Sequence, residues 1–209
     1  MREDIEKYWN SEEFQDKYQI AGEEISNYIF ELSRRYEQEY GMKCLRFTET
    51  RIKTIDSICG KLQRKGLELN PKVMEKKIND LAGVRMICFN TNQIYRIAKM
   101  ISEDDRYQII KAKDYITSPK HNGYQSYHIV VQVPVTYHSQ EAAVRVEIQL
   151  RTILMDAWAS MDAIVRYKKK KATPKNIEKM IEQFTKSIRE NDVIIRKIME
   201  ANSDEEEEK

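Results

Sequence analysis

Residues 144–151 read VRVEIQLR and alternate between apolar and polar side chains. Because successive side chains of a β-strand point to opposite faces, this pattern predicts a strand with one face in a hydrophobic core. The opposite face carries Arg145, Glu147, Gln149 and Arg151. That face is either a solvated outer surface or the floor of a cleft, where a carboxylate between two cations would bind a metal ion or accept a proton.

Hydrophobic periodicity places further strands and helices around this strand. Strands are predicted at 81–89, 107–114, 127–135 and 143–150, with a polar turn around 138–140. Helices are predicted at 21–40, at 51–66, after residues 90–92, at 152–168 and from Pro174 to about residue 200. This order predicts an α+β fold, in which helices flank a mixed β-sheet and extend the domain at both ends.

The chain is expected to divide into a helical segment packed on the core (1–45), the core (46–170), a C-terminal helix (171–200) and a disordered acidic tail (201–209). Apolar residues in the last helix alternate spacings of four and three, with one polar position. They are Ile177, Ile181, Phe184, Ile188, Asn191, Ile195 and Ile198. This seam either docks on the chain's own core or forms a subunit interface in which Asn191 sets the register.

Composition narrows the class of protein. The chain has 209 residues, of which 41% are hydrophobic and 33% charged. It contains no apolar run of about 18 residues and no signal peptide, so a cytoplasmic location without membrane contact is expected. The three cysteines show no metal-binding spacing and are expected to be reduced. The net charge of +2 argues against a dedicated duplex-DNA binder but allows a local cationic cleft.

The segment 115–128, YITSPKHNGYQSYH, is rich in turn residues and precedes a predicted strand. Lys120 suits a phosphate group, and the ring of Tyr124 suits a stacked base. Asn122 and His128 lie in the same segment. A surface turn with an exposed tyrosine is the alternative interpretation.

A second candidate is the basic segment that begins at Arg51. Lys53, Ser57 and Lys61 are spaced i, i+4 and i+8, which places them on one face of the predicted helix. This row either binds a polyphosphate or is a solvated basic surface. The chain has no Walker A loop and no GxGxxG motif, so phosphate binding cannot rest on a glycine-rich cradle.

Two charged residues accompany the apolar segment 81–89. Asp80 precedes it and is either an Mg²⁺ ligand or a strand-end residue without special function. Arg85 lies within it, and an arginine there needs an anion, a partner or a ring to stack on.

Together these segments resemble the synthetase domain of the RelA/SpoT family. The matching stretches are RIKTIDSICGKLQRKG (51–66), INDLAGVRMICF (78–89), YITSPKHNGYQSYH (115–128) and VEIQLRTILMDAWASM (146–161). The chain has about the length of one synthetase domain and contains no His-Asp dipeptide of a hydrolase domain, so it is similar to the small alarmone synthetases. The resemblance implies a nucleotidyltransferase-like fold that uses Mg²⁺ to transfer pyrophosphate from ATP to the 3′-hydroxyl of GDP or GTP, or of GMP.

The resemblance also implies roles for single residues. Arg51 and Arg85 would sandwich the adenine, and Lys53, Ser57 and Lys61 would hold the ATP phosphates. Asp80 would bind Mg²⁺, and Glu147 would activate the acceptor hydroxyl and approach the metal. The acceptor nucleotide would be held by Lys120, Asn122, Tyr124, His128, Gln149 and Arg151. Expected partners are further copies of the chain in a homotetramer, and single-stranded RNA as an inhibitor.

The sequence departs from the family pattern at three positions. Met161-Asp162-Ala163 stands where the family usually has Leu-Glu-His, so any role of that histidine is lost. Glu49 and Asp156 align with a cleft that binds an anionic alarmone effector in some small synthetases, and carboxylates there would repel it. Two other functions stay open. One is a toxin that pyrophosphorylates the 3′ end of tRNA, for which the basic run at 166–171 and the basic helix are the candidate RNA contacts. The other is a non-catalytic regulator that binds RNA or nucleotides.

Overall fold

A five-stranded mixed sheet forms the centre of the protein. The computed structural model describes residues 1–166 and 174–207. The strands are β1 (Phe47–Ile52), β2 (Ala82–Cys88), β3 (Gln108–Asp114), β4 (Tyr127–Tyr137) and β5 (Gln140–Thr152), in the order β1-β2-β5-β4-β3. Only β2 and β5 pair in parallel; the other neighbours are antiparallel. The predicted α+β class and the mixed sheet are confirmed.

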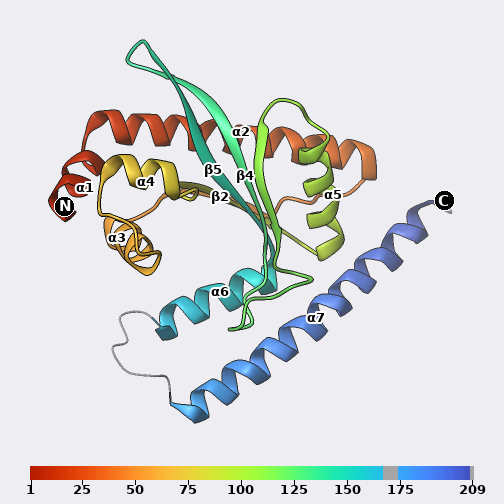
Figure 1. Cartoon of the computed structure of the whole chain (residues 1–209). Helices are drawn as coiled ribbons and strands as arrows, with labels where there is room; N and C mark the ends of the chain where they lie inside the picture. The colour runs from red at the N-terminus through yellow and green to blue at the C-terminus, as the bar shows by residue number, and fades with distance from the viewer. Residues whose placement is uncertain (167–173, 208–209) are drawn as a thin grey trace.

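Seven helices in the described part of the chain surround this sheet (Figure 1). They are α1 (Arg2–Trp9), α2 (Glu12–Tyr40), α3 (Ile55–Arg64), α4 (Pro71–Lys77), α5 (Thr91–Ser102), α6 (Ile153–Arg166) and α7 (Lys175–Glu207). The long helix α2 crosses one face of the sheet and contacts β1, β2, β4 and β5. Its apolar side and the sheet form the main hydrophobic core.

The alternating apolar and polar residues of β5 lie on opposite faces of the sheet, as the sequence predicts. Val144, Val146, Ile148 and Leu150 are at most 3% exposed and belong to the main core. The polar residues between them point to the opposite face of the sheet, where α2 does not lie. The pairing of β4 with β5 ends in a two-residue turn at His138 and Ser139, whose φ angles of 45° and 62° are typical of a type I′ hairpin.

The predicted helix at 51–66 is wrong at its start. Residues 51 and 52 end strand β1, because Arg51 and Ile52 pair with Gly83 and Ala82 of β2. The helix begins only after Thr54, whose hydroxyl accepts a hydrogen bond from the amide of Ser57. Lys53 therefore precedes the helix and does not share a helical face with Ser57 and Lys61.

The C-terminal helix α7 divides its apolar seam between two environments. Ile181 and Ile188 are buried against α6, whereas Phe184 and Ile198 are 41% and 56% exposed. Ile181 and Ile188 therefore dock on the chain's own domain, whereas a subunit interface along the rest of the seam stays a prediction. Most of the basic run 166–171 lies outside the described residues, as do residues 208–209. Residues 201–207, which the sequence predicts to be part of a disordered tail, continue α7 instead. Among the described residues, no helix is long and apolar enough to cross a lipid bilayer.

Candidate active site

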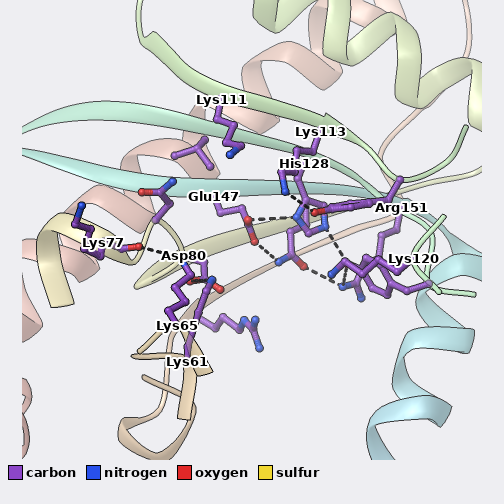
Figure 2. A pocket seen from close by; sticks show the side chains of 16 residues that line it. Lys61, Lys65, Lys77, Asp80, Lys111, Lys113, Lys120, His128, Glu147 and Arg151 are labelled. Carbon is purple, nitrogen blue, oxygen red and sulfur yellow. Dashed lines mark hydrogen bonds and ion pairs between the residues drawn. The ribbon is translucent and has the colours of Figure 1, made fainter. Parts of the chain in front are cut away.

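The polar face of β5 forms the floor of a cavity of about 460 Å³ (Figure 2). Strands β3 and β4, helix α3 and the segment before β4 complete its walls. Eight cationic side chains but only two carboxylates line it: Arg51, Lys61, Lys65, Lys77, Lys111, Lys113, Lys120, Arg151, Asp80 and Glu147. Such an excess of positive charge in a concave site attracts polyanions. A solvated outer surface is therefore the wrong interpretation of this face of β5.

Asp80 lies at one side of the cavity, where the chain enters β2. Its two carboxylate oxygens accept hydrogen bonds from Lys53 Nζ at 2.9 Å and Lys61 Nζ at 2.8 Å. Burial raises the pKa of Asp80, but the charge of Lys53 and the hydrogen bonds from both lysines outweigh it and lower the pKa to about 2. Asp80 is therefore ionised at neutral pH, and it pairs with two lysines, of which Lys61 lines the cavity.

Glu147 lies in the middle of the floor, and both of its oxygens are held. Gln149 Nε2 donates to Oε1 at 2.6 Å, and His128 Nδ1 lies 3.2 Å from Oε2. Burial raises the pKa of Glu147, but His128 and the hydrogen bond from Gln149 outweigh this effect and lower it. The structure thus presents an oriented, ionised carboxylate to the cavity.

Arg151 is connected by hydrogen bonds to both residues that contact Glu147, directly to Gln149 and through Tyr124 to His128. Its Nη2 donates to Gln149 Oε1 at 3.0 Å and to the Tyr124 hydroxyl at 2.8 Å. The Tyr124 hydroxyl in turn lies 2.9 Å from His128 Nε2. Because an arginine can only donate, Tyr124 accepts from it and donates its own proton to His128, which leaves the proton of a neutral His128 on Nδ1, facing Glu147.

The ring of Tyr124 has cations close to it. Lys120 Nζ lies 4.4 Å from the ring centroid, and the Arg151 guanidinium lies 5.2 Å from it. Lys120 also lies 4.7 Å from the ring of Tyr115, which meets His128 edge-on. An aromatic ring next to cations is suited to a planar base that carries phosphates.

Nine of the residues selected from the sequence line this cavity, and four do not. The nine are Arg51, Lys61, Asp80, Lys120, Tyr124, His128, Glu147, Gln149 and Arg151. Of the other four, Lys53 reaches Asp80, and Ser57 accepts a hydrogen bond from Thr54 in the first turn of α3. Asn122 turns away and donates to Asp162 at 3.3 Å.

Arg85 is the fourth residue outside the cavity lining. It donates to Glu49 at 2.8 Å and lies 3.3 Å from Asp156, which also accepts from Arg151 at 2.9 Å. The partner that an arginine in this strand requires is therefore a pair of carboxylates. These are the same carboxylates that the sequence suggests would repel an anionic effector.

Five further polar lining residues were not singled out from the sequence: Lys77, Asn79, Lys111, Lys113 and Tyr115. Lys111 and Lys113 alternate along β3 and therefore share a face, a signal of the kind used for β5. Lys77 ends the short helix α4 and Asn79 follows it; the periodicity did not predict this helix.

The carboxylates fit Mg²⁺ chemistry. Among the described residues no group of three or more His, Cys, Asp or Glu side chains is placed to hold a metal ion. Mg²⁺ does not need one, because it binds through one or two carboxylates together with substrate phosphates. Asp80 and Glu147 line the same cavity and are both ionised, and each Asp80 oxygen keeps a lone pair beside its bond to lysine.

Comparison with known proteins agrees with this geometry. Residues 50–172 match the family model described as the region found in RelA / SpoT proteins. The GTP pyrophosphokinase YwaC of Bacillus subtilis is 37% identical over 77% of this chain and 76% of its own. GTP pyrophosphokinase YjbM of the same organism is 30% identical over 87% of this chain and 84% of its own.

Solved structures share the fold. Small alarmone synthetase 1 from Bacillus subtilis, bound to its product pppGpp, superposes with a TM-score of 0.82 at 29% identity, over 93% of this chain and 98% of that one. The same enzyme bound to AMPCPP gives 0.80 at 27% identity, over 95% and 99%. A GTP pyrophosphokinase family protein from Streptococcus pneumoniae gives 0.83 at 27% identity, over 92% and 94%.

Proposed function

The chain belongs to the RelA/SpoT family, and from that membership we propose that it is a (p)ppGpp synthetase, which transfers pyrophosphate from ATP to the 3′-hydroxyl of GDP or GTP. GMP is a further candidate acceptor. The relatives that support this proposal are named GTP pyrophosphokinases, and one neighbour was solved with pppGpp and with AMPCPP. The observation that carries the proposal is the oriented, ionised Glu147 at the floor of a cationic cavity.

The reaction needs little covalent participation by the protein. The acceptor 3′-oxygen attacks the β-phosphorus of ATP, the bond between that phosphorus and the α,β-bridging oxygen breaks, and AMP leaves. The hydroxyl proton passes to Glu147. Catalysis of phosphoryl transfer rests mainly on positioning and on neutralising charge, and this cavity offers both.

ATP is proposed to occupy the Asp80 side of the cavity. Lys53 and Lys61 are already held there by Asp80, so a polyphosphate that enters would exchange one anionic partner of these lysines for another. Arg51 and Arg85 would flank the adenine, with Ser57 at the phosphates. Asp80 and Glu147 would hold Mg²⁺, which supplies charge neutralisation for the transferred pyrophosphate.

The acceptor is proposed to occupy the side formed by the segment before β4. The ring of Tyr124 would stack on guanine, with Lys120 and His128 near the acceptor phosphates. Gln149 and Arg151 line the same side and fix Glu147. Asn122 would contribute through the loop, because its Oδ1 accepts from the amide of Tyr124 at 3.3 Å.

The test is an acceptor assay with purified protein, Mg²⁺ and ATP labelled at the γ-phosphate. GMP, GDP, GTP and deacylated tRNA are offered side by side, and labelled ppGpp or pppGpp is expected. Glu147→Gln should abolish turnover but leave ATP binding intact, because the base is lost while the lysines stay. Label transferred only to tRNA, or no transfer while ATP binds, would refute the proposal.

Assembly is a further part of the proposal. The exposed apolar residues of α7, with Phe184 and Ile198 among them, favour a contact with another copy of the chain, for which a homotetramer is the expected form. Light scattering on the purified chain measures its mass directly. Inhibition by single-stranded RNA and a cytoplasmic location stay predictions from the sequence.

A further inference from the structure

Tyr124 lies between the active site and a second, small apolar cluster. Trp158 of α6 and Ile181 and Ile188 of α7 are buried in this cluster, which is separate from the main core. Tyr124 packs against it, and its ring centroid lies 6.3 Å from that of Trp158 in an edge-on contact. One side of the tyrosine is therefore supported by helices that do not line the cavity.

Trp158 is itself fixed by α7. Its indole Nε1 donates to Thr185 Oγ1 at 2.7 Å, and the Thr185 hydroxyl donates to the carbonyl of Ile181 one turn earlier, also at 2.7 Å. The threonine proton is committed to that carbonyl, so its lone pair faces the indole. Trp158 is only 3% exposed, and a buried N–H that loses its acceptor is costly.

The backbone of the acceptor loop also lies directly against α7. Gly123 has a φ of +90°, and a Cβ built there would stand 2.8 Å from Thr185 Cγ2 and 3.4 Å from Trp158 Cζ2. Two residues later, Gln125 Oε1 accepts from Arg189 Nε at 3.2 Å, and its Nε2 donates to the carbonyl of Ile116. The C-terminal end of the loop is thus tied to α7, and Gln125 links it to the start of the loop at Ile116.

We propose that Thr185 and Arg189 of α7 are positioning residues for the acceptor nucleotide, acting through Trp158 and the loop on the ring of Tyr124. The proposal rests on the function proposed above. It assigns part of the acceptor site to a helix that lies outside the family match at 50–172. On the ATP side, Lys53 and Lys61 are held by Asp80 instead, so their positions do not depend on these contacts of α7.

The variants Thr185→Val and Thr185→Ser together test whether the Thr185 hydroxyl positions the acceptor nucleotide. Valine keeps the shape but leaves the indole N–H without an acceptor, whereas serine keeps the hydroxyl. We expect the KM for GDP to rise about five- to tenfold in Thr185→Val and to stay near the wild-type value in Thr185→Ser. The KM for ATP should not change in either variant. Lys186→Ala is the control, since the Lys186 side chain is 80% exposed and its ion pair is with Glu190 of the same helix.

A binding measurement separates this inference from the proposed reaction. In a Trp9→Phe background Trp158 is the single tryptophan, so titration with GDP should change its fluorescence, and Thr185→Val should shift the midpoint to higher GDP. If Thr185→Val does not fold, Arg189→Ala serves instead. We expect its KM for GDP to rise about two- to threefold, which corresponds to the loss of one exposed hydrogen bond. The inference would be overturned if the KM values for GDP and ATP rose equally or if the KM for GDP did not rise. It would also be overturned if Lys186→Ala raised the KM for GDP by the same factor. A wild-type enzyme that binds GDP without turnover would refute only the proposed function.

Discussion

The carboxylate of Asp156 is shared by two guanidinium groups, and its charge should matter for stability. Arg151 Nη1 lies 2.9 Å from Asp156 Oδ1, and Arg85 Nη1 lies 3.3 Å from the same atom. Burial lowers the pKa of Arg85, and the nearby positive charge of Arg151 lowers it further. Asp156→Asn would retain a hydrogen-bond acceptor but remove the charge that separates these two cations.

The expected cost follows from the burial of the partners. The side chain of Arg151 is 7% exposed and that of Arg85 is 19% exposed, so water compensates little for the lost charge. Hydrogen bonds to charged groups contribute about 1.5–3 kcal/mol, and the asparagine oxygen recovers part of this. We therefore expect the free energy of unfolding to fall by about 2 kcal/mol, which lowers Tm by about 4–8 °C in a chain of this size.

The assay is thermal unfolding followed by circular dichroism, with Glu49→Gln as the matched control. Glu49 contacts Arg85 alone among the described residues and is 46% exposed, so its loss should cost at most about 0.5–1 kcal/mol. Inorganic triphosphate should recover more of the lost Tm in Asp156→Asn than it adds to the wild type, because it supplies the missing negative charge. A Tm within about 1 °C of the wild type, or an equal loss in Glu49→Gln, would show that the shared carboxylate is not what holds the two arginines.

Three further predictions concern other parts of the fold. Ser139→Gly should raise the free energy of unfolding by about 0.5–1 kcal/mol in urea titrations, because glycine adopts the φ of +62° without strain; a loss of stability would contradict the assigned turn. Gly22→Ala should destabilise by about 1–3 kcal/mol, because its Cβ would lie 2.6 Å from Thr50 Cγ2, and the added change Thr50→Ser should restore most of the loss. All three cysteines are buried and burial raises the pKa of each thiol, so at pH 8 iodoacetamide should label none of them in the native protein and all of them in denaturant, as mass spectrometry would show.

The sequence predicts the centre of the protein well because periodicity there reflects burial directly. Strand β5 has an apolar face in the core and a polar face on the cavity, and both were predicted from alternation alone. Strand β1 was missed because its residues are mostly exposed and lead into the basic segment without a break in composition. The row of Lys53, Ser57 and Lys61 was therefore wrong as a helical face, although two of its members do meet at Asp80.

The contacts between distant segments could not be predicted. Alternation places Gln149 and Arg151 on the same face as Glu147. Nothing in the sequence indicates that Arg151 also reaches Glu147 through Tyr124 and His128, because the pairing register of β4 with β5 brings His128 to this face. The same holds for Glu49 and Asp156. Their charges were recognised, but their partner Arg85 becomes visible only when β1, β2 and α6 are assembled.

The separation of the two apolar clusters implies unequal resistance to local opening. The main core joins α2 to the sheet, whereas the cluster that contacts Tyr124 has three buried members among the described residues. Units with few buried contacts open at lower free energy than the rest of a protein, so the amides of α7 should exchange with solvent before those of the sheet. On warming, the contacts that support the proposed acceptor side would therefore open while the sheet and the Asp80 side of the cavity were still folded.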